Sequence, residues 1–195
     1  MRLDNDSSPR FKNVIFRENK DETNQSNGGG AITVSDRALL LLDNCSFINN
    51  SVVSDNSSGS GGAIYLNSDP VNKKHLINGC HFEYNFVSAT YNAQGSALFI
   101  RDATDIINSV FVFNSATSEQ SEAQGTIFYE GPDLSSGNNY NGTSMNFINN
   151  TVANNSVASP NNNSSAAAIY YCDWVPGQGR NSSTLYAFNN IIYGN

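Results

Sequence analysis

Two short motifs alternate along the whole chain, and their alternation constrains the fold more than any other feature of the sequence. The first is a small-residue pair followed by a large aliphatic residue, as in Gly62-Ala63-Ile64, with copies centred at residues 31, 63, 97, 126 and 168. The second is Phe-x-x-Asn, as in Phe82 to Asn85, with Phe at 16, 47, 82, 111 and 147 and an Ile variant at 192. Such an alternation indicates a stack of one repeated unit.

The spacing of the motifs indicates strands and not helices. The copies of the first motif are separated by 32, 34, 29 and 42 residues, and those of the second by 31, 35, 29, 36 and 45. Apolar residues inside the motifs alternate with period two, as Ile64 and Leu66 do around Tyr65, and a 3.6-residue period is found only in the short run Ala38 to Leu42. We therefore expect an all-β parallel β-helix of about five coils, with two or three short strands per coil and loops at its corners.

In a parallel β-helix, equivalent residues of successive coils form columns about 4.8 Å apart. The motifs predict two columns in the core, whose members are Phe16, Phe47, Phe82, Phe111 and Phe147, and Ile32, Ile64, Leu98, Ile127 and Ile169. The Asn that ends the second motif is expected to form a hydrogen-bonded ladder at one corner, made of Asn19, Asn50, Asn85, Asn114 and Asn150.

Composition excludes some classes of partner. The 195 residues suffice for one domain with a core, but the net charge of −7 and only 10 Lys and Arg argue against nucleic acid. The sequence has no run of about 20 apolar residues, so we expect no membrane span in this chain. Cys45 and Cys80 occupy equivalent positions, two residues before the motif Phe. We expect both to be small buried side chains; the alternatives are a disulfide between neighbouring coils or a metal site.

The two motifs resemble the repeats of the polymorphic outer membrane protein family, whose passenger regions are right-handed β-helices of the pectin-lyase-like class. The copies closest to that pattern are Gly62-Ala63-Ile64 with Phe82 to Asn85, and Gly30-Ala31-Ile32 with Phe47 to Asn50. The resemblance covers Phe16 to Asn195 and implies a right-handed helix with an adhesin-like or scaffold role outside the cell or at its surface. The first residues lack the apolar core of a signal peptide, so the protein either stays inside the cell or is a piece of a longer secreted chain. Because Asn195 falls on the repeat motif itself, we expect the single domain 1–195 to belong to a longer secreted chain.

Aromatic residues follow the aliphatic residue of the first motif and are expected to point outward. They form a predicted column of Tyr65, Phe99, Phe128 and Tyr170, with Thr33 at the equivalent place in an earlier coil. One interpretation is a platform on which sugar rings or a protein surface stack. The alternative is that a long loop folds over the column and hides it.

Acidic residues recur four to six positions after the small residue of the first motif: Asp36, Asp69, Asp102, Glu130 and Asp173. If these carboxylates met on successive coils, they would repel one another unless a cation lay between them, so calcium is the one cofactor that the pattern suggests. The alternative is that each carboxylate caps backbone amides in a turn, with Arg37 and Arg101 compensating part of the charge.

An enzyme is the second class of function considered. The best candidate group is Asp69, Lys73, Lys74, His75, Arg101, Asp102 and Asp105, since polysaccharide lyases need a base beside acids and hydrolases need converging carboxylates. The acids fall one per coil and no nucleophile motif is present, so no catalytic residue is assigned. We expect a non-catalytic surface adhesin or structural scaffold that binds a glycan, a protein surface or copies of itself end to end; the alternative is a polysaccharide lyase or hydrolase, or a glycan-binding module.

Overall fold

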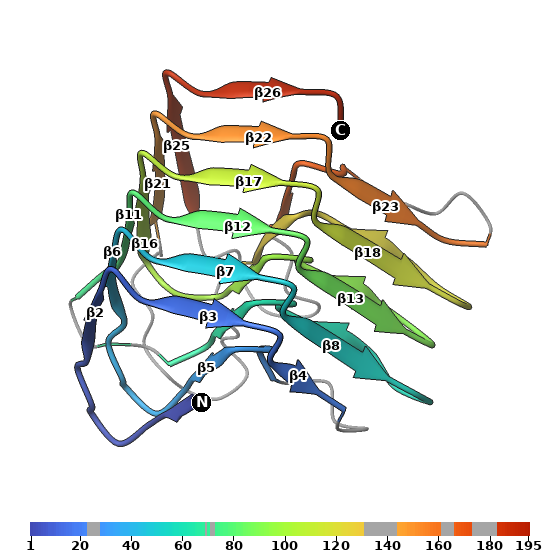
Figure 1. Ribbon diagram of the computed structural model, residues 1–195, viewed down its shortest axis with the longest axis horizontal. Helices are drawn as coiled ribbons and strands as arrows, with labels where there is room; N and C mark the ends of the chain where they lie inside the picture. Colours follow the sequence, from blue (N-terminus) through green and yellow to red (C-terminus); the bar gives the residue numbers. More distant parts are fainter. Residues whose placement is uncertain (23–27, 69, 71–72, 131–143, 161–165, 173–182) are drawn as a thin grey trace.

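The chain folds as a right-handed parallel β-helix, which confirms the predicted fold class. The computed structural model describes residues 1–22, 28–68, 70, 73–130, 144–160, 166–172 and 183–195, and within them every regular element is a β-strand (Figure 1). Sheet A contains β1 (Arg2–Leu3), β5 (Ile32–Val34), β10 (Ile64–Leu66), β15 (Leu98–Ile100), β20 (Ile127–Glu130) and β24 (Ile169–Cys172). Sheet B contains β2 (Arg10–Lys12), β6 (Leu41–Asp43), β11 (His75–Asn78), β16 (Thr104–Ile107), β21 (Ser144–Ile148) and β25 (Thr184–Phe188).

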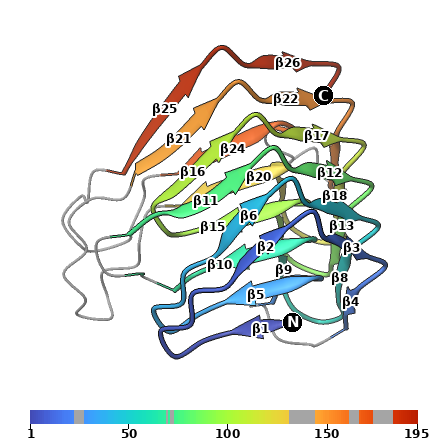
Figure 2. The ribbon, with the colours of Figure 1, turned by 60° about the vertical axis from the view of Figure 1, so that its left-hand side comes forward.

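Three further sheets complete each coil. Sheet C contains β3 (Ile15–Arg17), β7 (Ser46–Ile48), β12 (His81–Glu83), β17 (Val110–Val112), β22 (Thr151–Ala153) and β26 (Ile191–Tyr193). Sheet D contains β4 (Lys20–Asp21), β8 (Ser51–Ser54), β13 (Phe86–Ala89), β18 (Ser115–Ser118) and β23 (Ser156–Ala158). Sheet E contains β9 (Gly59–Ser60), β14 (Ala93–Gln94) and β19 (Ala123–Gln124). Five coils and most of a sixth therefore rise from the N-terminal rung to the C-terminal one (Figures 1 and 2).

The number of strands per coil was underestimated from the sequence. Two or three were expected, whereas the coils have four, and the middle ones a short fifth. The segment 115–124 is polar and has few of the residues that favour strands, yet it contains β18 and β19. β18 lies between β13 and β23, and β19 pairs with β14; this pairing with neighbouring coils outweighs the weak intrinsic β-propensity of the segment.

The two motifs mark equivalent rungs, as predicted. Ile64 lies between Ile32 and Leu98 in sheet A, and Phe82 lies between Phe47 and Phe111 in sheet C. The Phe rings stack with centroids 4.7–4.8 Å apart and nearly parallel planes. The small residues of the first motif let two backbones approach, because a Cβ on Gly62 would lie 2.0 Å from the carbonyl oxygen of Ser96.

Both corners that flank sheet C are built in the same way. A residue in the left-handed backbone region is followed by a residue whose side chain or backbone bonds to the next coil. Before sheet C the left-handed residues are Asn13, Asn44, Gly79, Asn108, Asn149 and Asn189, and after it they are Glu18, Asn49, Tyr84, Phe113, Asn154 and Gly194. Asn and Gly suit this conformation, which explains why the sequence is rich in both.

The predicted Asn ladder is present at the corner between sheets C and D. Asn85 illustrates its bonding: its Nδ2 donates to the carbonyl oxygen of Phe47 and to Oδ1 of Asn114, both at 2.9 Å. Its Oδ1 accepts from the backbone N–H and from Nδ2 of Asn50, at 3.0 and 2.9 Å. All four hydrogen-bonding sites of this buried amide are therefore satisfied. The ladder contains Asn19, Asn50, Asn85, Asn114, Asn155 and Asn195.

Two members of the predicted columns, Phe147 and Asn150, were placed wrongly. Phe147 is buried, but it lies in sheet B beside Ile106, and Val152 takes the place after Phe111 in sheet C. Asn150 lies at the corner before sheet C, in the column of Cys45, Cys80 and Ser109, and Asn155 holds the ladder position. The mistake has a physical cause. Both corners use a left-handed residue, often Asn, followed by a residue that bonds to the next coil. Phe147 to Asn150, at the corner before sheet C, therefore shows the same sequence pattern as Phe47 to Asn50, at the corner after it.

The core is sealed in the middle coils and open at the last rung. Ile32, Ile64, Leu98 and Ile127 are completely buried, whereas Ile169 is only partly buried. In the last coil Phe188, Ile191, Ile192 and Tyr193 are 52–59% exposed, since no described rung lies above them.

The Asn ladder leads to a stability test. Replacing Asn85 with Ala leaves partners on both neighbouring coils without their hydrogen bonds, so we expect the free energy of unfolding to fall by about 2–4 kcal/mol in denaturant titrations. The control is Asn19→Ala, because Asn19 is bonded on one side only, and it is expected to cost less than about 1 kcal/mol. Equal losses for the two variants would mean that the ladder does not hold the coils together.

Candidate functional site

The aromatic column expected on the outer face of sheet A is buried. Tyr65, Phe99 and Phe128 are 4%, 2% and 3% exposed, while Tyr170 at the end of the column is partly exposed. The rings are stacked at 4.8–5.1 Å, and the guanidinium of Arg101 lies 5.3 Å from the ring of Phe99. Burial also raises the pKa of the Tyr65 hydroxyl. The column is a second small core, and the prediction that it forms an open platform is wrong for its first three members.

A different pair of aromatic residues is exposed, at the corner between sheets C and D. Tyr84 and Phe113 are 49% and 43% exposed, and their rings stack at 5.2 Å. Both occupy the left-handed position, with φ of 53° and 57°, where neighbouring coils have Asn49 and Asn154. Phe86, which is 37% exposed, follows at the start of β13. We call Tyr84, Phe113 and Phe86 the aromatic corner.

The backbone makes the aromatic corner unusual. A bulky residue in the left-handed region is an outlier that costs on the order of 1–3 kcal/mol, and stacking of two rings returns about 0.5–1.5 kcal/mol. Strain of this kind occurs where the surrounding structure enforces it, often at binding sites. Sequence reasoning missed the corner, although the Tyr84-Asn85 and Phe113-Asn114 pairs, where other coils have Asn-Asn, were a visible signal.

The acidic residues do not gather in one column. Asp36 is exposed in a left-handed turn, Asp102 is buried, and Glu130 is ion-paired with Arg101 at 2.7 Å. By strand register Glu130 is level with Arg101 and not with Asp102, because Tyr129 pairs with Ile100. Asp69 and Asp173 lie outside the described residues. Among the residues that are described, no group of three or more His, Cys, Asp and Glu could hold a metal ion.

Asp102 instead joins a buried cluster with Ser68 and His75. The Nε2 of His75 is 3.2 Å from Oδ2 of Asp102 and 3.3 Å from Oγ of Ser68, and Nδ1 of His75 accepts the backbone N–H of Leu40 at 3.1 Å. Oδ2 of Asp102 also accepts the backbone N–H of Ser68 at 2.7 Å. His75 and Asp102 are 27 positions apart in the sequence and meet only because the coil brings them together.

The geometry of this cluster is structural and not catalytic. In a nucleophile-activating triad the acid bonds one ring nitrogen of His and the nucleophile the other. Here Ser68 and Asp102 both face Nε2, while a backbone amide occupies Nδ1. The Oγ of Ser68 is 2.8 Å from the carbonyl oxygen of Ala38, to which it donates. All three side chains are at most 5% exposed, so a substrate would have no access to them.

The other members of the candidate enzyme group are dispersed. Lys74 pairs with Asp105 at 3.2 Å across sheet B, and Asn146 donates to the same carboxylate at 2.7 Å. Arg101 is engaged by Glu130 on sheet A. Lys74 and Arg101 are therefore neutralised in separate pairs on different sheets, Lys73 is exposed, and Asp69 lies outside the described residues.

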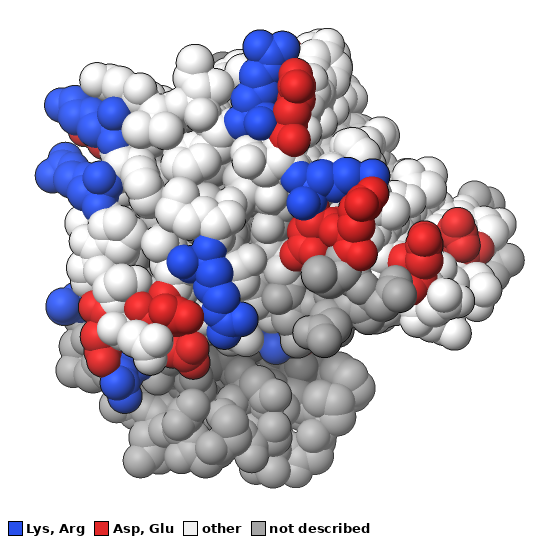
Figure 3. Space-filling model, turned by 60° about the horizontal axis from the view of Figure 1, so that its bottom comes forward, with Lys and Arg blue, Asp and Glu red and all other residues white. Residues whose placement is uncertain are grey.

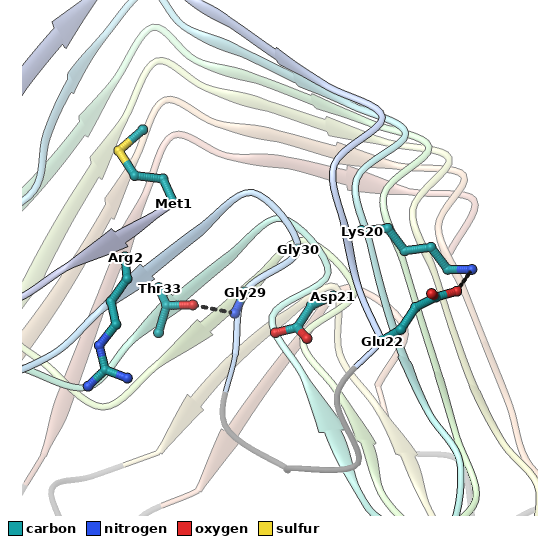
Figure 4. A pocket seen from close by; sticks show the side chains of 8 residues that line it. All are labelled: Met1, Arg2, Lys20, Asp21, Glu22, Gly29, Gly30 and Thr33. Carbon is teal, nitrogen blue, oxygen red and sulfur yellow. Dashed lines mark hydrogen bonds and ion pairs between the residues drawn. The ribbon is translucent and has the colours of Figure 1, made fainter.

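A pocket of about 470 Å³ opens at the N-terminal rung (Figure 4). Its lining residues are Met1, Arg2, Lys20, Asp21, Glu22, Gly29, Gly30 and Thr33. Lys20 is ion-paired with Glu22, and the backbone N–H of Gly29 donates to Oγ1 of Thr33 at 2.9 Å. Arg2 and Met1 lie on the opposite side of the pocket from Lys20 and Glu22, so the charges of the lining do not point to a common ligand atom.

The surface carries charges of both signs. Figure 3 shows that several basic groups on the face nearest the N-terminal rung lie directly beside acidic ones. In the parts of the chain that the structure describes, no helix is long and apolar enough to cross a membrane.

The three cysteines have free thiols. Cys45 and Cys80 are 1% exposed in neighbouring coils, as their equivalent positions predicted, and Cys172 is partly exposed. Burial raises the pKa of the Cys80 thiol to about 12. The reading of Cys45 and Cys80 as small buried side chains is confirmed, and the disulfide and metal alternatives are not.

Comparison with known proteins identifies no relative of this chain. A scan against protein-family models, a search of curated proteins and a search of solved structures each find no match. The resemblance to polymorphic outer membrane protein repeats therefore stays a prediction from the motifs.

The cysteines provide a test of burial. In a variant that keeps only Cys80, with Cys45 and Cys172 replaced by Ala, we expect an aromatic disulfide reagent to react at pH 8 on the order of 100-fold more slowly than with unfolded chain, because the raised pKa of Cys80 suppresses the thiolate. The variant that keeps only Cys172 is the matched control and should react much faster in the native state. Similar native rates would contradict the burial of Cys80.

The aromatic corner allows a separate test of strain. Replacing both Tyr84 and Phe113 with Asn, the residue that neighbouring coils use, relieves the left-handed strain and removes the ring stack. We expect the free energy of unfolding to stay unchanged or to rise by up to about 1 kcal/mol. A loss of more than about 1 kcal/mol would show that the aromatic pair is present for stability and not for binding.

Proposed function

We propose that this chain is a non-catalytic structural scaffold at the cell surface or outside the cell. The observation that carries the proposal is the unbroken side-chain ladder, which binds each coil to the next along the whole stack. A solenoid of this kind is stiff and extended, because each rung contacts only its neighbours and adds a fixed rise. The resemblance of the motifs to bacterial surface repeats supports the location.

The geometry disfavours the enzyme alternative for two reasons. In the buried pair of His75 and Asp102 the carboxylate faces the same ring nitrogen as Ser68, and Lys74 and Arg101 are each paired with a carboxylate elsewhere. Hydrolysis needs two carboxylates flanking one sugar bond, and elimination needs an unpaired base next to bound substrate. Neither set is assembled within the described ranges.

Incubation with a panel of acidic and neutral polysaccharides tests the absence of catalysis. We expect neither new reducing ends nor the ultraviolet absorbance of an unsaturated uronate product, with heat-denatured protein as the blank. Product that appears with the wild type and disappears with Asp102→Asn would overturn the scaffold proposal in favour of an enzyme.

Deleting a whole coil tests the scaffold itself. Removal of residues 80–108 joins Gly79 to Ser109, which occupy successive positions of the same corner in neighbouring coils. We expect the shortened chain to unfold cooperatively and its long dimension in X-ray scattering to decrease by about 4.8 Å. A deletion variant that fails to fold would show that the coils are not interchangeable structural units.

A second function, binding at the aromatic corner, is favoured by one observation: two strained and exposed rings stacked on neighbouring coils. Asn49 and Asn154 hold the equivalent positions on either side of the two rings, and an aromatic face suits the apolar face of a sugar. In a glycan-array experiment the Tyr84→Asn, Phe113→Asn variant should lose binding, whereas Tyr91→Asn, which removes an exposed ring elsewhere, should keep it. Retained binding by the double variant would exclude the corner.

A further inference from the structure

The corner between sheets C and D carries two copies of the acceptor sequence for N-linked glycans, which is Asn-x-Ser or Asn-x-Thr with any residue but Pro in the middle. The copies are Asn49-Asn50-Ser51 and Asn154-Asn155-Ser156. In each copy the acceptor Asn is the exposed left-handed residue, and the residue in the middle is the buried ladder Asn. A glycan on the acceptor therefore leaves the ladder intact. None of these ladder residues begins such a sequence: Asn19, Asn50, Asn85, Asn114 and Asn155.

The two acceptors lie on either side of the stacked rings of the aromatic corner. Asn49, Tyr84 and Phe113 each donate their backbone N–H to the carbonyl oxygen of the residue just before the next member of their column. The order from coil to coil is therefore Asn49, Tyr84, Phe113 and Asn154. Each acceptor thus has an exposed aromatic residue as its neighbour on the adjoining coil, at about the 4.8 Å spacing of paired strands.

Each ring has one face that the other ring does not cover. The rings of Tyr84 and Phe113 stack on each other at 5.2 Å with an angle of 14° between their planes. Because they stack along the column, the remaining face of Tyr84 is turned toward the coil of Asn49, and that of Phe113 toward the coil of Asn154. At 49% and 43% exposure, both rings keep surface that a sugar on the neighbouring Asn can reach.

The side-chain amides of both acceptors are available for modification. Within the described part of the chain, neither Asn49 nor Asn154 makes a side-chain hydrogen bond. Asn149, which begins a third acceptor sequence at the corner before sheet C, differs in two ways. Its Nδ2 donates to Oδ1 of Asn108 at 3.3 Å, and its column contains Asn and Gly but no aromatic residue. Asn149 is therefore an internal control.

We propose that Asn49 and Asn154 are attachment sites for N-linked glycans whose first pyranose ring packs against Tyr84 and Phe113. This inference rests on the sugar-binding function proposed for the aromatic corner and names the sugar as one that the chain itself carries. The donor is an oligosaccharide linked to a lipid pyrophosphate. In the transfer, C1 of the first sugar forms a bond to Nδ2 of the Asn and Nδ2 loses one proton. The bond from C1 to the pyrophosphate oxygen breaks, so that the lipid pyrophosphate leaves.

An attached sugar explains why this column has bulky residues at a position that favours Asn. The apolar face of a pyranose suits an aromatic face, and a sugar tethered one coil away is held beside the ring at a high effective concentration. Contact with the sugar therefore offsets part of the cost of the left-handed backbone at Tyr84 and Phe113. It also covers apolar ring surface that is otherwise exposed to water.

The first measurement asks whether the sugars touch the rings. The full chain is secreted from a eukaryotic host that glycosylates such sequences, and the glycans are trimmed enzymatically to the first N-acetylglucosamine. Mass spectrometry of peptides should find this sugar on Asn49 and Asn154. NMR should then show upfield ring-current shifts for the sugar protons on these two residues, whereas a sugar on Asn149 should show none.

The second measurement couples the sugar to the ring. The variant Tyr84→Gly, Phe113→Gly removes both rings, suits the left-handed backbone as Gly194 does in the same column, and creates no new acceptor sequence. The trimmed sugars should raise the folding equilibrium constant of the wild type about fivefold or more above the gain that they give this variant. Each gain is measured against the same chain made without sugar in a bacterial cytosol, so that sugars elsewhere on the chain cancel.

The outcomes separate this inference from the functions proposed above. Sugar missing from Asn49 and Asn154, sugar present without upfield shifts in the wild type, or an equal gain in stability with and without the rings would overturn it. If the shifts are absent but the sugar-free chain binds in the glycan array, the corner takes a free sugar and only this inference falls. If both are absent, the sugar-binding function falls as well, while the scaffold proposal stands.

Discussion

The hydrogen bonds between asparagine side chains of successive coils fix the rest of this structure. A parallel strand pair alone tolerates sliding by two residues, because that shift preserves which side chains face inward. A buried amide whose four bonding sites are all used, as in Asn85, does not tolerate it, since a shift would leave donors and acceptors unsatisfied in the interior. The ladder thereby sets the register, and the register places Phe82 on Phe47 and Ile64 on Ile32.

A fixed register turns each position of the coil into a column with one environment. In the column that contains Tyr65, the aromatic residues Tyr65, Phe99 and Phe128 are buried, so they form a core. The corner position of Tyr84 is open, so the same residue type there forms surface, at a backbone conformation that favours Asn.

Sequence reasoning recovered the fold because the constraint recurs. Asn50, Asn85 and Asn114 each follow a strand with one buried Phe, so the pattern carries both the corner and the core. It failed in the fifth coil, where Val152 replaces Phe and the unrelated Phe147 supplies a false motif. The intervals held the signal: from Phe111 through Val152 to Ile192 they are 41 and 40 residues, against the less regular 36 and 45 through Phe147.

The candidate sites were harder to predict, because exposure depends on what covers a column and not on the column itself. Period-two alternation places Tyr65 and Phe99 outside the main core correctly but gives no information about a second layer above them. The pairing of His75 with Asp102 depends on the start of β11 meeting a bend of the next coil, which no local pattern encodes. The most direct test of the account is hydrogen exchange of the Asn side-chain amides followed by NMR. The Nδ2 protons of Asn50, Asn85 and Asn114 should exchange only on global unfolding, while those of exposed Asn149 and Asn154 exchange freely; ladder amides that exchange as fast as the exposed ones would contradict it.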